Sequence, residues 1–167
     1  FGIYVMVVQL GLALLQLQYP IVKATLPFLA KNDADSNLGY FPLLSFIIVS
    51  IPSVIMFFFT KDILYLWSKN AEVVRYGEQI IKVLSIAVLV NFFYNFVHVK
   101  LVINNYGKIL ITLQLIVILA NGLFLYIFTP KLHEVAGAYA WLINFSLILF
   151  MGKILILRKE RERKRWM

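Results

Sequence analysis

Long apolar stretches separated by short polar connections dominate the pattern of this chain. Each stretch approaches or exceeds the roughly 20 residues that an α-helix needs to cross a bilayer. We expect five such helices, at residues 1–27, 41–60, 79–103, 109–129 and 135–157. The pattern therefore predicts an all-α, polytopic transmembrane helix bundle that occupies residues 1–157.

Prolines and glycines mark the places where these helices should bend or end. Pro20 and Pro52 lie within the first two stretches, so both helices are expected to be kinked or interrupted. Gly107 and Pro130 are expected to end the third and fourth helices. The charged residues 61–78 form the expected connection between the second and third spans. Within it, residues 69–80 alternate charged and apolar side chains and are expected to form an amphipathic helix entry at the membrane surface.

The composition supports a membrane protein and removes several kinds of chemistry. The chain is 62% hydrophobic and 14% charged, whereas soluble domains average about half and about a quarter. It has no cysteine, which excludes disulfides, thiol nucleophiles and cysteine-based metal sites. No Gly-rich phosphate loop or HExxH motif is present. We therefore expect no cofactor and no metal site.

The net charge of +8 is concentrated at the C-terminus. Residues 158–167 form a tail that carries six basic side chains: Arg158, Lys159, Arg161, Arg163, Lys164 and Arg165. Basic residues near helix ends are retained in the cytoplasm, so the tail is expected to be cytoplasmic. Counting back through five spans places Lys23, Lys31, Lys100 and Lys108 on the same side. This asymmetry indicates contact with anionic lipid headgroups and not with nucleic acid.

The first apolar stretch contains a candidate substrate-binding line. Gln9, Gln16 and Lys23 recur every seven residues, which keeps them within about 40° of one another on a regular helix. Amides can both donate to and accept from sugar hydroxyls, and an ammonium group can bind a pyrophosphate. In the alternative interpretation the glutamines bond neighbouring helices, while Lys23 extends to the lipid headgroups.

A second polar stripe runs along the third span. Asn91, Tyr94, Asn95, His98 and Asn105 fall within about a third of the circumference of a regular helix. Polar groups at membrane depth face protein or water, so the stripe should point into the bundle. It is either a hydrogen-bonded seam between helices or part of a polar path for sugar. The seam is the favoured interpretation.

Two further pairs complete the list of candidates. Gln114 and Asn121 repeat the seven-residue spacing on the fourth span, where they are expected to join helices.

His133 and Glu134 are the nearest approach to a catalytic pair, as a membrane polysaccharide polymerase or acyltransferase would need. Because no pair of acids lies at membrane depth, the chain is not expected to be an enzyme.

Residues 42–74 and 104–143 carry a family likeness. Its marks, in order, are Pro52, then Asp62-Ile63-Leu64 followed by Leu66-Trp67, then Gly107-Lys108 opening a helix, then Gly137-Ala138 with Ala140, together with Pro27 near the start. In this order and spacing the chain resembles the C-terminal half of the oligosaccharide-lipid flippases of bacterial surface polysaccharide (O-antigen or capsule) biosynthesis. These belong to the multidrug/oligosaccharidyl-lipid/polysaccharide exporter superfamily.

The resemblance implies a two-lobed helical exporter of the bacterial cytoplasmic membrane, of which this chain supplies most of the second lobe. Such a protein carries undecaprenyl-pyrophosphate-linked oligosaccharide by alternating access. The expected partners are this lipid-linked oligosaccharide, membrane lipids, the N-terminal lobe and other polysaccharide-assembly proteins.

The chain begins within apolar sequence, so we expect it to be a fragment of a longer protein. In this superfamily the first two helices of each lobe supply most of the central cleft. This likeness strengthens the seam interpretation of the stripe at Asn91 and leaves the line of Gln9, Gln16 and Lys23 as the better candidate for substrate binding. Multidrug export by the same superfamily is the alternative function.

Overall fold

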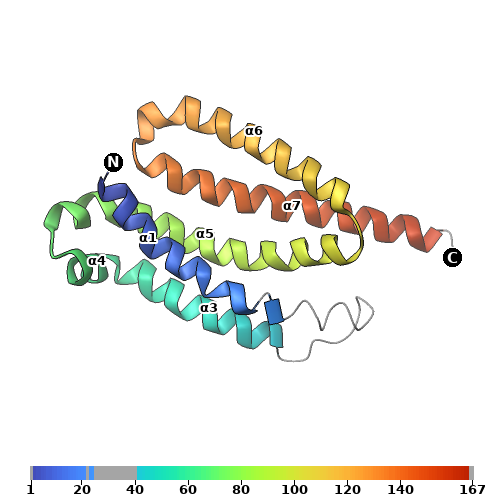
Figure 1. Cartoon of the computed structure of the whole chain (residues 1–167), viewed down its shortest axis with the longest axis horizontal. Coiled ribbons are helices and arrows are strands. Elements are labelled where there is room, and N and C mark those ends of the chain that lie inside the picture. Colours follow the sequence, from blue (N-terminus) through green and yellow to red (C-terminus); the bar gives the residue numbers. More distant parts are fainter. Residues whose placement is uncertain (1, 22, 25–40, 166–167) are drawn as a thin grey trace.

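A computed structural model describes residues 2–21, 23–24 and 41–165 (Figure 1). Pro27 and Lys31, which carried two of the expectations above, lie outside the described residues. Within them the chain is helical, with no strand. The helices are α1 (Gly2–Gln16), α3 (Phe41–Phe58), α4 (Thr60–Ser68), α5 (Ala71–Ile103), α6 (Gly107–Leu132) and α7 (Val135–Arg165). The predicted all-α fold is confirmed.

Helix α5 is the centre of the bundle. It packs against α1, α3, α4 and α7, while α6 packs mainly against α7 (Figure 1). The fully buried side chains cluster along α5, at Ile80, Ile81 and Val88, and meet Val7 of α1 and Leu64 of α4. The core is therefore an aliphatic contact between α5 and the helices that precede it in the chain.

A glycine allows α1, α4 and α5 to approach closely. A Cβ atom built on Gly77 of α5 would lie 2.6 Å from Cγ2 of Val7 and 3.2 Å from Cδ1 of Leu64. Only a residue without a side chain fits there without movement of its neighbours. The sequence places this glycine where three helices meet.

The described part of the chain has four helices that are long and apolar enough to cross a membrane. These are Gly2–Ile21, Ala71–Ile103, Gly107–Leu132 and Val135–Arg158. A fifth candidate is the bent pair formed by α3 and α4. The helices thus indicate a multi-pass membrane protein, as the apolar pattern predicted.

The stretch at residues 61–78 differs from the expectation in part: the helix expected at residues 69–80 is present as the start of α5, but residues 60–68 are helical as well. It contains α4 and the first two turns of α5, which begins at Ala71 and not at Gln79. The side chain of Asn70 caps α5 by accepting a hydrogen bond from the backbone N–H of Glu72, with N and O 2.9 Å apart. The charges that suggested a loop lie on the outer sides of these helices.

Prolines affect the first two spans differently. Helix α1 ends at Gln16, a turn follows at Leu17, and helical conformation resumes at residues 18–21. This interruption matches Pro20, which lacks an N–H and whose ring clashes with the carbonyl of Gln16. Pro52, in contrast, lies inside α3, which continues from Phe41 to Phe58 without a break.

Three expectations at the ends of the later helices are corrected. Helix α5 ends at Ile103, and Asn105 follows in the left-handed conformation with a φ of 57°. Asn105 therefore leaves the polar stripe, because it lies beyond the helix. Gly107 begins α6 and does not end α5. Pro130 lies inside the last turn of α6, which continues to Leu132.

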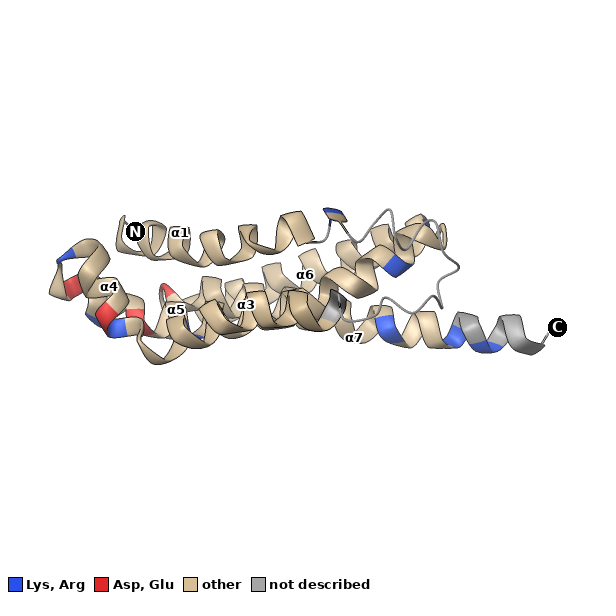
Figure 2. Cartoon of the chain, turned by 90° about the horizontal axis from the view of Figure 1, so that it is seen from below, with Lys and Arg blue, Asp and Glu red and all other residues tan. Residues whose placement is uncertain are grey.

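Charged side chains divide the bundle into two different ends (Figure 2). The described Asp and Glu side chains gather at the end where α4 lies, mixed there with lysines and arginines (Figure 2). They are Asp62, Glu72, Glu78 and Glu134. At the opposite end, where α7 finishes, Figure 2 marks Lys and Arg positions along the helix, and the sequence of residues 158–165 carries six basic and two acidic residues.

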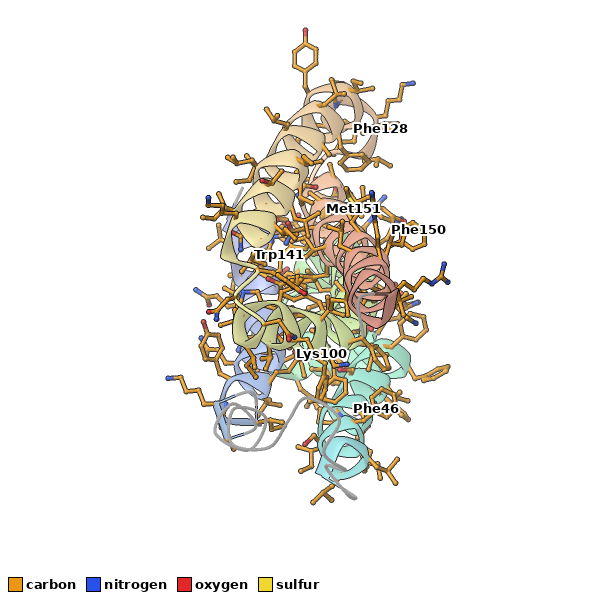
Figure 3. All side chains as sticks on the ribbon, turned by 90° about the vertical axis from the view of Figure 1, so that its right-hand side faces the viewer. Phe46, Lys100, Phe128, Trp141, Phe150 and Met151 are labelled. Carbon is orange, nitrogen blue, oxygen red and sulfur yellow. The ribbon has the colours of Figure 1, made fainter. Side chains whose placement is uncertain are left out.

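Aromatic side chains mark the inside and the outside of the α6–α7 arm. Viewed along the bundle, Phe150 of α7 points outward, and 67% of its surface is exposed (Figure 3). Trp141 of α7 lies between the helices, 6.1 Å from Phe145 between ring centroids (Figure 3). The outer side of α6 is also apolar and exposed, as at Leu119 and Tyr126.

Candidate functional site

A cavity of about 660 Å³ lies between the C-terminal part of the first span and helices α5 and α7. Two sets of polar residues proposed from the sequence meet there. Its polar and charged lining comprises Gln16, Gln18, Lys23, Asn91, Asn95 and His98. The rest of the wall is aliphatic and aromatic: Leu12, Leu15, Tyr19, Tyr94, Val99, Val102 and Phe145.

Gln18 is the hydrogen-bonding centre of this region. Its side chain is almost completely buried, with 1% of the residue exposed. Its Nε2 donates to the carbonyl oxygen of Val88, at 2.7 Å. Its Oε1 accepts from Nδ2 of Asn91 at 2.7 Å and from Nδ2 of Asn95 at 3.0 Å. Three hydrogen bonds thus join the first span to α5, and the amide of Gln18 has little left to offer a ligand.

The sequence analysis did not single out Gln18, although it lies in the same apolar stretch as Gln9 and Gln16. A seven-residue line assumes one regular helix, and the turn at Leu17 changes the direction of the residues that follow. A usable signal was the asparagine stripe itself. Buried amides need partners, and Gln18 was a third glutamine within reach of a neighbouring span.

The polar stripe on α5 follows from helical spacing. Asn91 and Asn95 are one turn apart, and His98 is three residues further, so all three share a face. Tyr94 lies beside them, with its ring centroid 5.6 Å from that of His98 and 5.8 Å from that of Phe145. Helices α5 and α7 therefore give the cavity an aromatic wall next to its amides.

The remaining polar groups of the first span lie at the rim of the cavity. Gln16 and Lys23 are both exposed. Nζ of Lys23 lies 5.6 Å from the ring centroid of Tyr19, a cation–π distance. Among the described residues that line the cavity, none is a carboxylate. This part of its wall thus combines an apolar and aromatic body with the ammonium group of Lys23 at the rim.

Three predicted polar residues lie away from this lining. Gln9 is exposed on α1 and does not line the cavity. Gln114 of α6 is exposed and does not line the cavity. Oδ1 of Asn121, also on α6, is buried and has no hydrogen-bond partner among the described residues.

The pair predicted as the nearest catalytic candidate lines a smaller pocket of about 420 Å³ at the other end of the bundle. His133 and Glu134 share it with Tyr4 and Thr129. His133 has a φ of 48° in the turn between α6 and α7. Among the described residues no group of three His, Cys, Asp or Glu side chains could hold a metal ion.

Comparison of the chain with protein-family models, with curated proteins and with solved structures gave no match. Arguments about function therefore rest on the residues and on the geometry of the cavity.

Proposed function

We propose that this chain forms most of the second lobe of a flippase in the bacterial cytoplasmic membrane. The complete protein would carry undecaprenyl-pyrophosphate-linked oligosaccharide across the membrane for surface polysaccharide biosynthesis. The single observation that carries the proposal is the cavity between the first span and α5, where Gln16, Tyr94 and Lys23 line one space. The family likeness of the sequence agrees with this proposal.

The chemistry of the cavity suits such a substrate in three ways. Aromatic rings such as those of Tyr94 and Phe145 can pack against the apolar faces of sugars and against prenyl chains. The amide of Gln16 can both donate to and accept from hydroxyl groups. The ammonium group of Lys23 at the rim can pair with a pyrophosphate.

The proposed orientation puts the C-terminus of α7 in the cytoplasm. The supporting observation is the excess of basic residues at that end, because residues 158–165 carry six Lys and Arg against Glu160 and Glu162. Lys23 then lies at the cytoplasmic end of the cavity, where a lipid-linked substrate enters. Transport would proceed by rocking of this lobe against the N-terminal lobe.

Multidrug export by the same superfamily is the second candidate. The observation that favours it is the aromatic wall, in which Tyr94 contacts both His98 and Phe145. Flat, apolar cations bind readily to such a wall. A drug exporter would tolerate the loss of Lys23, whereas a pyrophosphate carrier would not.

The test compares Gln16→Leu and Lys23→Gln with Gln9→Leu in the complete protein. Gln9 is the matched control, because it lies on the same helix but does not line the cavity. We expect both cavity variants to lower surface glycan at least about tenfold, equivalent to about 1.4 kcal/mol, at unchanged membrane abundance. The control should export normally.

Normal export by both cavity variants would remove them as substrate contacts. If drug resistance falls with Gln16→Leu and glycan export does not, the multidrug function replaces the flippase. Equal loss in all three variants would mean that the glutamines act through folding of α1.

A further inference from the structure

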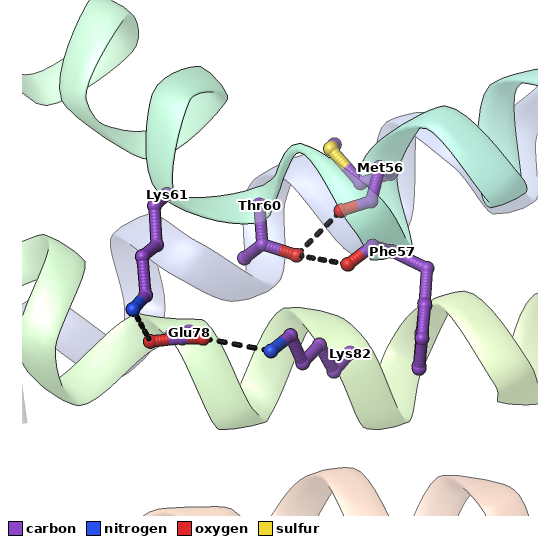
Figure 4. A network of polar contacts seen from close by, with 6 residues as sticks. All are labelled: Met56, Phe57, Thr60, Lys61, Glu78 and Lys82. Atoms are coloured by element: carbon purple, nitrogen blue, oxygen red, sulfur yellow. Dashed lines mark hydrogen bonds and ion pairs between the residues drawn. The ribbon is translucent and has the colours of Figure 1, made fainter.

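Helix α4 is bent sharply away from the helix that precedes it. Its axis is bent by 83° from that of residues Leu43–Phe58 in α3. The hydroxyl of Thr60 stabilises the corner by donating to the carbonyl oxygens of Met56 and Phe57, at 2.5 and 3.0 Å (Figure 4). These contacts satisfy carbonyls that the end of α3 leaves without intrahelical partners. The bend is therefore a stabilised part of the fold.

Contacts with α5 hold α4 in this direction. Leu64 is fully buried, and Gly77 of α5 leaves room for it. Nζ of Lys61 lies 3.5 Å from Oε2 of Glu78, and Oε1 of the same carboxylate accepts from Lys82 at 2.7 Å (Figure 4). One carboxylate on α5 thus binds a lysine on each side, and one of the two belongs to α4.

The outer side of this corner carries large apolar side chains that no described residue covers. Phe58 and Leu66 are both 74% exposed, Phe59 is 56% exposed and Trp67 is 41% exposed. Basic side chains accompany them, since Lys61, Lys69 and Arg75 are all exposed. Aromatic and aliphatic groups interspersed with Lys and Arg are typical of the boundary between acyl chains and headgroups.

The direction of α4 decides between possible partners. The spans run along the bundle, so a helix at 83° to α3 lies nearly parallel to the membrane surface. The apolar outside of α3, including Ile51 and Ile55, leads directly to Phe58 at the corner. The exposed surface of α4 is therefore continuous with a surface that faces acyl chains, and its lysines complement anionic headgroups.

We propose that α4 is an interfacial helix that docks on the phospholipid bilayer. It lies at the end of the bundle opposite the C-terminus of α7 (Figure 1). Trp67 and Leu66 enter the headgroup boundary of that leaflet, and Lys61 and Lys69 contact lipid phosphates. This inference does not rest on the transport proposal, because it depends only on the corner and on the spans.

The test uses the fluorescence of Trp67 in the full chain. The double variant Trp141→Phe and Trp166→Phe leaves Trp67 as the sole tryptophan. It is placed in vesicles of phosphatidylcholine and phosphatidylglycerol, brominated either next to the headgroup or near the end of the acyl chain. Iodide serves as the quencher in water. A matched variant with Trp141 as the sole tryptophan reports a position between the spans.

We expect bromine next to the headgroup to quench Trp67 at least about twice as strongly as deep bromine, with little quenching by iodide. The reverse order of the two brominated lipids would overturn the inference, because α4 would then dip into the membrane as part of a broken span. Strong quenching by iodide alone would also overturn it and place α4 in water. Protection from all three quenchers would mean that protein covers the corner, which equally contradicts a lipid partner.

Discussion

Helices α5 and α6 are both apolar enough to span a membrane, yet their surroundings differ. Half of the apolar window of α5 is buried inside the bundle, against 11% for α6. The difference lies in small and polar residues. Helix α5 offers Gly77 for close packing and Asn91 for an interhelical hydrogen bond. Hydropathy thus identifies a span, but these residues decide whether it meets protein or lipid.

The two helices also differ in whether their polar side chains have hydrogen-bond partners. The amides of Asn91 and Asn95 on α5 both reach Gln18, whereas Oδ1 of Asn121 on α6 has no partner among the described residues. Gly122, beside it, has nothing within 4 Å of an added Cβ atom. The inner helix is therefore sensitive to substitution, and the outer helix should tolerate it.

The largest effect is expected for Gln18→Leu. The change removes the amide that accepts from Asn91 and Asn95 and donates to Val88, and each buried group left unsatisfied costs about 1 to 3 kcal/mol. We expect the free energy of unfolding to fall by about 3 kcal/mol. Titration of the protein in detergent micelles with dodecyl sulfate, followed by circular dichroism, would measure it. Unchanged stability would show that the three hydrogen bonds do not hold α1 to α5.

A smaller loss of stability is expected for Gly77→Leu, and Gly122→Leu should show no such loss. The added side chain at Gly77 collides with Val7 and Leu64, and such overpacking costs about 2 kcal/mol. A Cβ atom at Gly122 has nothing within 4 Å, and leucine favours helix over glycine by about 1 kcal/mol. The same unfolding titration should give a lower free energy of unfolding for Gly77→Leu than for the unchanged chain, and an equal or higher one for Gly122→Leu. Equal losses would erase the contrast between α5 and α6.

The smallest effect is expected for Asn91→Leu compared with Asn121→Leu. The first removes one interhelical hydrogen bond, worth about 1 kcal/mol in a membrane bundle, while Asn95 still satisfies Gln18. The second replaces an amide whose buried oxygen has no partner in the part of the chain that the structure describes, so stability should stay equal or rise. Thermal unfolding of both variants in the same detergent shows whether each substitution lowers or raises the stability. Glycan export lost at full stability in Asn91→Leu would instead assign Asn91 to the sugar path.

The spans were predictable because long apolar stretches have few other uses. The corner at α4 was not, because Lys61 and Asp62 interrupt the apolar pattern just as a loop would. In the fold these two side chains simply lie on the exposed side of a short helix, while Thr60 and Leu64 face the core. A pattern of charges alone does not distinguish a loop from a helix that turns aside.

The cavity was predictable in part. The asparagine stripe was visible because helical spacing relates Asn91, Asn95 and His98 within one helix, whereas Gln16 and Lys23 both reach the cavity although the turn at Leu17 separates them. The two sets line the same cavity only because of how the first span packs on α5. Such tertiary packing is not visible in the spacing of residues along the chain. Gln18 was missed because its direction depends on the turn at Leu17, which no periodicity spans.

Helix α7 has one more consequence, which comes from its length. Its 31 residues correspond to about 46 Å at 1.5 Å per residue, while the hydrocarbon core of a bilayer is about 30 Å thick. About 16 Å of helix therefore extends past the hydrocarbon core, and the headgroup regions, which bring the bilayer to about 40 to 45 Å, take up most of it. The basic C-terminal turns of α7 thus continue the span as one helix through the depth of the headgroups, and their position is fixed by the packing of α7 in the bundle.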